Sequence, residues 1–158
     1  MKSQKIIKFF LSFFGVGFIK YAPGTFGSIA TIPFMYFISL KEIPFLYFVL
    51  FLVALTALSC VLAEYIQKKE HIHDPGWIVI DEVIGMLVTW LLFYPTFNFQ
   101  IALSVLIVFR FFDIIKFWPA SYFDKQVTNG FGTIIDDVLS AFYAIAVLYI
   151  LQKFITIS

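Results

Sequence analysis

Residues 45–63 read FLYFVLFLVALTALSCVLA, a run of 19 residues without a single charged side chain. A helix needs about 20 largely apolar residues to cross the hydrocarbon core of a bilayer. The rest of the 158-residue chain has the same character, since 61% of its residues are hydrophobic, 21% are aromatic and only 13% are charged. Ordinary soluble domains carry about 25% charged residues. The composition therefore excludes a disordered chain, a disulfide scaffold and a typical soluble enzyme, and it predicts an integral membrane protein.

Four further apolar segments accompany this run. They cover residues 28–40, 83–94, 99–112 and 138–155. Several of them are shorter than a usual span, so we expect little tilt, local thinning of the bilayer or partly re-entrant packing. Together the segments predict one all-α domain over residues 1–158, a compact multi-pass helical bundle with about five membrane segments.

The N-terminus imitates a secretory signal, because Lys2, Lys5 and Lys8 precede the apolar stretch 9–19. Residues 12–18 offer no convincing small-x-small cleavage site. We therefore expect residues 1–20 to be retained as an amphipathic helix that lies at the membrane interface.

The few charges are unevenly divided along the chain. If every apolar segment crosses, the N-terminus shares one side of the membrane with two long polar connections, 64–80 and 116–135, while two tight turns share the other side. Nine of the eleven basic residues and nine of the ten acidic residues then lie on the side of the long connections. The positive-inside rule places that side in the cytoplasm, so we expect a membrane protein with a polar site that faces the cytoplasm. The net charge of +1 indicates no surface for nucleic acid.

Acidic residues mark the ends of the predicted helices on this side. Asp81 and Glu82 begin one segment, Asp113 ends another, and Asp136 and Asp137 begin the last. Clustered carboxylates repel one another unless a cation binds among them, and oxygen-rich clusters suit Mg²⁺, which also bridges to substrate phosphate. Acids at helix starts also act as caps that the helix dipole favours, and for any single acid that alternative stays open. The five acids together favour a metal site.

Basic and hydroxyl residues near these acids indicate phosphate binding. Arg110 and Lys116 lie three residues before and after Asp113, so acid and bases share one arc of a helix. Both cations could neutralise phosphate oxygens beside a metal. The stretch APGTFGS, which contains Thr25 and ends at Ser28, opens an apolar segment and could form an anion cradle of backbone N–H groups. Ordinary turns and N-caps use the same residue types.

Three other reactive side chains are interpreted as structural. His71 and His73 flank an isoleucine in a polar connection, but no third ligand accompanies them at zinc spacing. Cys60 lies in an apolar run, and position 66 is Ile66, where a cysteine phosphatase loop would need arginine. We expect Cys60 to be a small core residue, and a single cysteine excludes an internal disulfide.

Four blocks of sequence, taken in order, closely resemble the phosphatidylglycerophosphatase A family. The blocks are GTFGS at 24–28, DP at 74–75 leading to IVIDEVIGM at 78–86, FRFFDIIK at 109–116 with WP at 118–119, and the stretch from Gly130 to Asp136 and Asp137. They extend over residues 22 to 141, which is most of the chain. One position departs from the family pattern Lys-Pro-Trp-Pro, because Phe117 replaces the first proline.

The resemblance implies a compact all-helical membrane phosphatase that uses Mg²⁺ to convert phosphatidylglycerophosphate to phosphatidylglycerol and phosphate. Together with the charge pattern, it leads us to expect catalytic roles for Asp81, Glu82, Asp113, Lys116 and Asp137. Metal ligation is expected from Asp81, Glu82, Asp113, Asp136 and Asp137. Substrate binding is expected from Thr25, Ser28, Arg110 and Lys116.

Several alternatives stay open at this stage. In-line attack by metal-bound water is favoured, but the sequence does not separate it from an aspartyl-phosphate route. The chain could act on another lipid phosphate, or be a small transporter subunit with ion-relaying acids, which would place acids in mid-span rather than at segment ends. The small residues Ser140, Ala141 and Ala144 indicate close helix packing, either within the monomer or across a homodimer.

Overall fold

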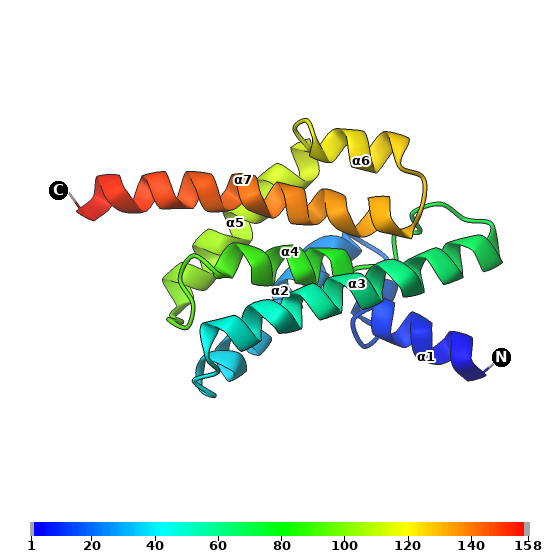
Figure 1. The fold of residues 1–158 in the computed structure, drawn as a ribbon, viewed down its shortest axis with the longest axis horizontal. Coiled ribbons are helices and arrows are strands. Elements are labelled where there is room, and N and C mark those ends of the chain that lie inside the picture. Colours follow the sequence, from blue (N-terminus) through cyan, green and yellow to red (C-terminus); the bar gives the residue numbers. More distant parts are fainter. Residues whose placement is uncertain (1, 157–158) are drawn as a thin grey trace.

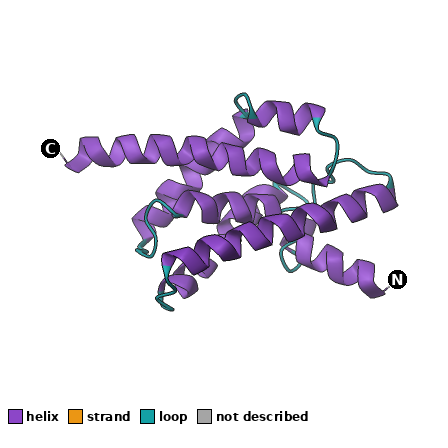
Figure 2. Ribbon diagram, viewed as in Figure 1, coloured by secondary structure: helices purple, strands orange, loops and turns teal. Residues whose placement is uncertain are grey.

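The chain folds into helices throughout the part that the computed structural model describes, residues 2–156, which contains no strand (Figures 1 and 2). This confirms the all-α expectation. The elements are α1 (Lys2–Leu11), a short 3-10 helix (Val16–Phe18), α2 (Pro23–Ser39), α3 (Phe45–Glu70), α4 (Ile80–Trp90), α5 (Phe99–Ile115), α6 (Ala120–Gln126) and α7 (Gly130–Thr156).

Two helices of this described part, α3 and α7, are long and apolar enough to cross a membrane. They comprise the 26 residues of α3 and the 25 residues Gly130–Phe154 of α7. Most of each apolar window is not buried inside the molecule, which is unlike the core helix of a soluble protein. The two helices run in opposite directions along the molecule (Figure 1). These features indicate a membrane protein.

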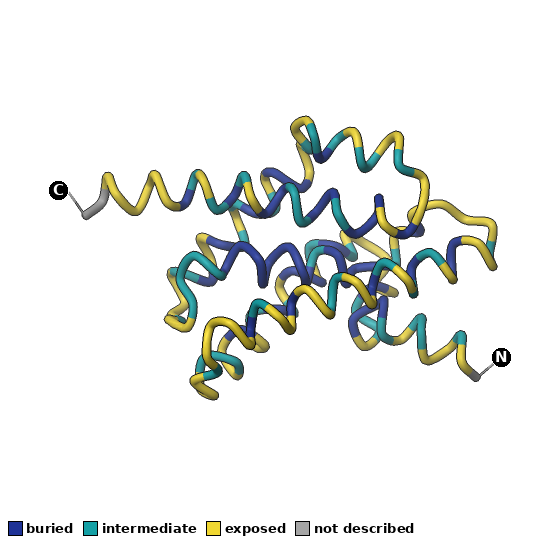
Figure 3. The backbone as a smooth tube through the Cα atoms, in the orientation of Figure 1, coloured by how far each residue is buried: buried dark blue, intermediate teal, exposed yellow. Residues whose placement is uncertain are grey.

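The expected number of about five membrane segments is wrong, because the other apolar helices are too short. α2 and α5 have 17 residues each and α4 has 11. At about 1.5 Å per residue these lengths are about 26 Å and about 16 Å, against a hydrocarbon core of about 30 Å. Protein rather than lipid covers α4, which packs against α2, α3, α5 and α7 and buries every residue except Glu82 (Figure 3). The apolar composition of a helix does not by itself show whether protein or lipid surrounds it.

The N-terminal segment forms a shorter helix than expected, since α1 has only ten residues. Lys8 connects α1 to the end of α3 through an ion pair with Glu70 at 2.6 Å, and its ammonium lies 5.2 Å from the ring centre of Trp77. Ile6 and Phe9 on α1 remain exposed. The helix thus presents apolar side chains outward while Lys8 is fixed on the bundle, and its position at a membrane interface stays a prediction.

The long helices α3 and α7 are joined where one ends and the other begins. Glu64 Oε2 accepts a hydrogen bond from the Gly130 backbone N–H at 2.6 Å, and Gln67 Nε2 donates to Thr133 Oγ1 at 2.8 Å. The first N–H groups of a helix lack partners within it, so Glu64 acts as a cap for α7. Glu64, the acid that follows the apolar run 45–63, therefore has a structural role.

The small residues of the last segment serve packing inside the chain. Ser140, Ala141 and Ala144 have no exposed surface, and α7 packs here against α4 and α5. Small side chains let helix backbones approach closely. These residues therefore account for contacts within the monomer, and the homodimer stays a prediction.

Candidate active site

A cavity of about 250 Å³ lies where the starts of α2, α4 and α7 meet the end of α5. Six carboxyl groups and two cationic side chains line it, in a chain with few charges. The lining residues are Ala22, Pro23, Gly24, Asp74, Gly76, Ile78, Asp81, Glu82, Arg110, Asp113, Lys116, Asp136 and Asp137. The fold thus brings together all five acids and both bases that the sequence singled out.

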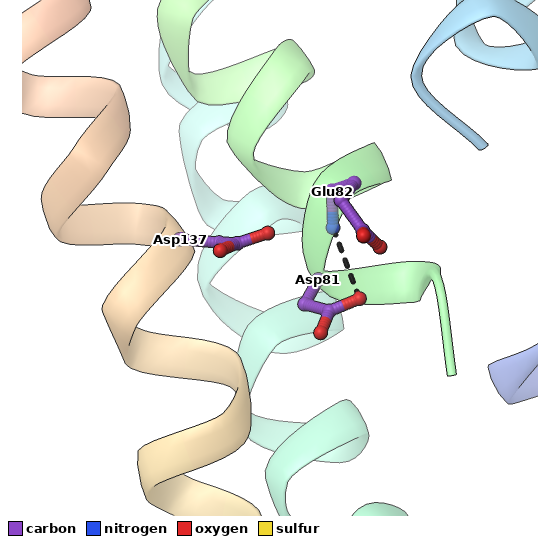
Figure 4. A group of neighbouring side chains, drawn as sticks. All are labelled: Asp81, Glu82 and Asp137. Atoms are coloured by element: carbon purple, nitrogen blue, oxygen red, sulfur yellow. Dashed lines mark hydrogen bonds between the residues drawn. The ribbon is translucent and has the colours of Figure 1, made fainter. Parts of the chain in front are cut away.

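Three of these acids form a compact group. One carboxylate oxygen from each of Asp81, Glu82 and Asp137 lies within 4.8 Å of the other two, and Figure 4 shows Asp137 on α7 directed toward the pair on α4. Asp81 and Asp137 are 8% and 2% exposed. Asp81 Oδ1 also accepts a hydrogen bond from the Glu82 backbone N–H at 3.1 Å, which fixes the first turn of α4. Two helix starts therefore hold three carboxylates at one point.

The acid group has the properties of a cation site. Burial raises the pKa of both Asp81 and Glu82, and the nearby charge of Glu82 raises that of Asp81 further. Glu82 Oε2 is buried and has no hydrogen-bond partner. A buried carboxylate oxygen without a partner is costly unless a cation binds to it. An all-carboxylate donor set fits Mg²⁺, which prefers oxygen ligands, and the residues that would hold it are Asp81, Glu82 and Asp137.

Arg110 lies between the acid group and the end of its own helix. Its Nη1 donates to Asp113 Oδ2 in a short contact and lies 3.6 Å from Glu82 Oε1. Its Nε is buried and has no hydrogen-bond partner. A guanidinium in a cavity with a free N–H donor is suited to bind a phosphate oxygen. Asp113 is therefore paired with a cation rather than placed in the acid group.

Lys116 is the second cationic side chain that lines the cavity. Its ammonium forms a short contact with Asp136 Oδ2, and lies 2.9 Å from Asp124 Oδ1 and 3.8 Å from Asp137 Oδ1. Burial alone would lower the pKa of Lys116, but the charges of Asp137 and Asp136 outweigh it and the pKa lies above its ordinary value. Lys116 is thus the ion-pair partner of Asp136.

The start of α2 closes the cavity with backbone rather than with hydroxyl groups. Gly24 lies so close to Glu82 and Arg110 that an added Cβ would overlap the Glu82 carboxylate. Thr25 and Ser28 do not line the cavity, and Ser28 Oγ donates to the Gly24 carbonyl oxygen at 3.0 Å. Serine in the first turns of a helix often bonds the carbonyl four residues earlier, and this bond turns its hydroxyl away from a ligand.

Two acidic residues at the site were not among those predicted. Asp74 lines the cavity from the loop before α4, and Asp124 on α6 binds Lys116. Asp74 lay within a block of the family resemblance, which was the signal that could have identified it. Nothing in the spacing of Asp124 points to Lys116. Of the residues interpreted as structural, neither histidine lines the cavity, and Cys60 lies on α3 outside it.

The cavity can therefore bind two opposite charges side by side. Asp81, Glu82 and Asp137 form an anionic group with an unsatisfied oxygen, while Arg110 and Lys116 present cations at its border. Such a site suits a divalent cation together with an anionic oxygen group, which is the arrangement used for phosphoryl transfer.

Comparisons with known proteins give one family. A family model described as phosphatidylglycerophosphatase A matches residues 9–152. A phosphatidylglycerophosphatase A of Haemophilus influenzae is 41% identical over 140 residues, which cover 88% of this chain and 84% of that protein. The phosphatidylglycerophosphatase A of Escherichia coli is 35% identical over 136 residues, covering 86% of this chain and 77% of that protein. No solved structure matches the chain.

Proposed function

Because the chain belongs to the phosphatidylglycerophosphatase A family, we propose that it hydrolyses the phosphomonoester of phosphatidylglycerophosphate to give phosphatidylglycerol and phosphate. Membership of this family confirms the resemblance of the four sequence blocks. Both relatives are named for this activity, and the match to this chain covers more than three quarters of the length of each.

One observation carries the assignment to this cavity. Glu82 has a buried carboxylate oxygen and Arg110 a buried N–H group, each without a partner, and the two side chains lie 3.6 Å apart. A cation would satisfy the Glu82 oxygen, and an anionic oxygen would satisfy the Arg110 N–H group. A bound metal–phosphate pair would satisfy both groups at once.

The residues then take the following parts in the reaction. Asp81, Glu82 and Asp137 would hold Mg²⁺, which when bound would polarise phosphate oxygens and lower the pKa of water. Arg110 and Lys116 bind the phosphate oxygens and stabilise the charge that develops on them in the transition state.

Asp113 and Asp136 orient these two cations through their ion pairs, and they are the candidate general bases because they lie in the cavity outside the three-acid group. We favour direct attack by water. A covalent phosphoenzyme trapped with labelled substrate would instead establish the aspartyl-phosphate route.

We further propose that α3 and α7 cross the bacterial cytoplasmic membrane with the cavity facing the cytoplasm. Supporting this, the end of α3, the start of α7 and the N-terminus lie at the same end of the molecule (Figure 1), and this end includes the lysines of α1 and those in the last turn of α3. The orientation can be tested with a membrane-impermeant maleimide in a Cys60→Ala background. Lys125→Cys on α6 should react only in inverted vesicles, which expose the cytoplasmic face. Lys41→Cys, in the turn between α2 and α3, should react only in intact cells. The opposite labelling pattern would reverse the orientation.

The function is tested with purified protein in detergent micelles. We expect Mg²⁺-dependent release of phosphate from phosphatidylglycerophosphate, with much lower rates on phosphatidate and on a water-soluble phosphomonoester. Asp81→Asn serves as the inactive control for contaminating phosphatases. Preferred hydrolysis of phosphatidate would assign another lipid phosphate as substrate, and equal rates on all three would remove the lipid specificity. Absence of hydrolysis of any of them would refute the enzyme assignment.

A further inference from the structure

The short helix α6 lies between the elements that carry the basic and the acidic residues of the cavity, and it packs tightly on the start of α7. Ala120 is fully buried, and the rings of Phe123 and Phe131 lie 6.0 Å apart. A Cβ on Gly132 would overlap the backbone carbonyl oxygen of Val127, just after α6. The glycine therefore permits the close approach that holds α6 in place.

From α6, Asp124 binds the ammonium of Lys116. Asp124 Oδ1 lies 2.9 Å from Lys116 Nζ, although Asp124 does not line the cavity. The same ammonium contacts Asp136, and it lies 3.8 Å from Asp137 Oδ1. Lys116 ends α5 in the left-handed backbone region, with φ of 46°, so the chain turns there toward α6. Three carboxylates from two helices thus compete for one ammonium.

We propose that Asp124 is a positioning residue for Lys116. Pulling on the ammonium from α6 while Asp136 binds it from α7, Asp124 keeps it 3.8 Å from Asp137 Oδ1, so that it stays available to a phosphate. Without Asp124, the two remaining carboxylates draw the ammonium into the acid group. There it would neutralise Asp137 and withdraw from the substrate. This role rests on the proposed function, since it presupposes a phosphate bound in the cavity.

The sign of the effect separates positioning from simple electrostatics. Asp124→Asn removes a negative charge near the phosphate site, and by Coulomb's law that change alone would tighten phosphate binding. Loss of positioning weakens phosphate binding instead. Asp124→Glu keeps the charge and reaches the same ammonium, so it should restore most of the loss.

The experiment titrates the Mg²⁺-loaded proteins with inorganic phosphate by calorimetry in detergent micelles. Lys125→Ala is the matched control, because Lys125 is the next residue on α6, is exposed and lies outside the cavity. We expect Asp124→Asn to weaken phosphate binding by about tenfold or more, as removal of outer-shell partners does in metal sites. Lys125→Ala should bind phosphate like the unaltered protein. The value of kcat/KM for the lipid should fall in parallel in Asp124→Asn.

Phosphate binding to Asp124→Asn that equals or exceeds that of the unaltered protein overturns the positioning role. If Asp124→Asn does not fold, Gly132→Ala provides a second test. This substitution keeps Asp124 but displaces α6, because the added Cβ would overlap the Val127 carbonyl oxygen. Unchanged phosphate binding in Gly132→Ala would also overturn the positioning role. Absence of phosphate binding to the unaltered protein overturns it as well. If binding behaves as expected but no lipid phosphate is hydrolysed, the proposed function fails and the role of Asp124 stands.

Discussion

Replacing Gly24 by alanine tests the geometry of the cavity with a single methyl group. Gly24 lies in the first turn of α2 against the side chains of Glu82 and Arg110. An added Cβ would overlap Glu82 Oε1, and would lie 2.9 Å from Glu82 Cδ and 3.1 Å from Arg110 Nη1. Ordinary contact begins at 3.4 Å, so Cδ must retreat by about half an ångström and the oxygen by more.

We expect the helix to tolerate this change better than the proposed metal site does. Alanine is favoured over glycine in helices by up to about 1 kcal/mol, and the groups that must move are ends of flexible side chains. Displacement of groups in a metal site commonly costs about 10- to 100-fold in metal affinity or activity. We therefore expect Gly24→Ala to keep its unfolding temperature within a few degrees. The Mg²⁺ concentration for half-maximal activity should rise about 10- to 100-fold.

Gly76→Ala is the matched control for this prediction. Gly76 lines the same cavity, but a Cβ at that position would meet no atom within 4 Å. The assay measures hydrolysis of phosphatidylglycerophosphate in micelles as a function of Mg²⁺ concentration for both variants. Equal Mg²⁺ requirements of Gly24→Ala and Gly76→Ala would refute the placement of Glu82 as a metal ligand pressed against α2.

Further predictions concern the acids of the cavity and the cap of α7. Asp81→Asn, Asp113→Asn and Asp137→Asn should each abolish phosphate release while the protein still inserts into membranes, as fractionation would show. Glu64→Ala should lower the free energy of unfolding by about 1 kcal/mol, because the Gly130 N–H loses its cap, and should leave the specific activity of folded protein unchanged. Since burial raises the pKa of Asp81, protons compete with Mg²⁺, and the half-saturating Mg²⁺ concentration should fall as the pH rises through that raised pKa. The metal-free protein should become less stable as the pH rises toward that raised pKa, because Asp81 binds its proton more tightly in the folded protein than in the unfolded chain.

Each of these predictions has a result that contradicts it. Normal turnover in all three asparagine variants would show that the chemistry lies elsewhere. A large loss of specific activity in folded Glu64→Ala would place Glu64 in the reaction. A Mg²⁺ requirement independent of pH would show that Asp81 does not bind the metal, and titration calorimetry in two buffers of different ionisation enthalpy would detect the expected proton release directly.

The sequence predicts helices in this chain better than it predicts where they lie. The first residue of α3 is correctly predicted at Phe45, but the helix continues past Ala63 to Glu70. Its charged last turns are supported by the ion pair between Glu64 and Lys68 at 2.8 Å. α4 is predicted as a membrane segment because its residues are apolar, and only the three-dimensional packing shows that protein surrounds them. The helix α6 is missed because its seven residues carry no apolar periodicity that stands out from a polar connection.

The acids and bases of the cavity are predictable because charges are scarce in this chain and tend to mark helix ends. Thr25 and Ser28 are less predictable, since the same hydroxyl can bind a ligand or its own helix, and here Ser28 binds its own helix. Asp124 is unpredictable for a different reason. Its partner Lys116 lies eight residues away across a turn and a new helix, and no local rule relates the two positions.

The order in which the cavity residues occur along the chain has a consequence for biosynthesis. A growing chain presents Asp81 and Glu82 first, then Arg110 and Lys116, and it acquires Asp136 and Asp137 only with the final helix. Before α7 leaves the ribosome, the acid group lacks its third carboxylate and Lys116 lacks its partner on α7. If the three acids hold Mg²⁺ as proposed, a nascent chain therefore lacks one metal ligand and one of the two close acidic partners of Lys116, and we expect lipid hydrolysis to begin only after synthesis of the whole bundle.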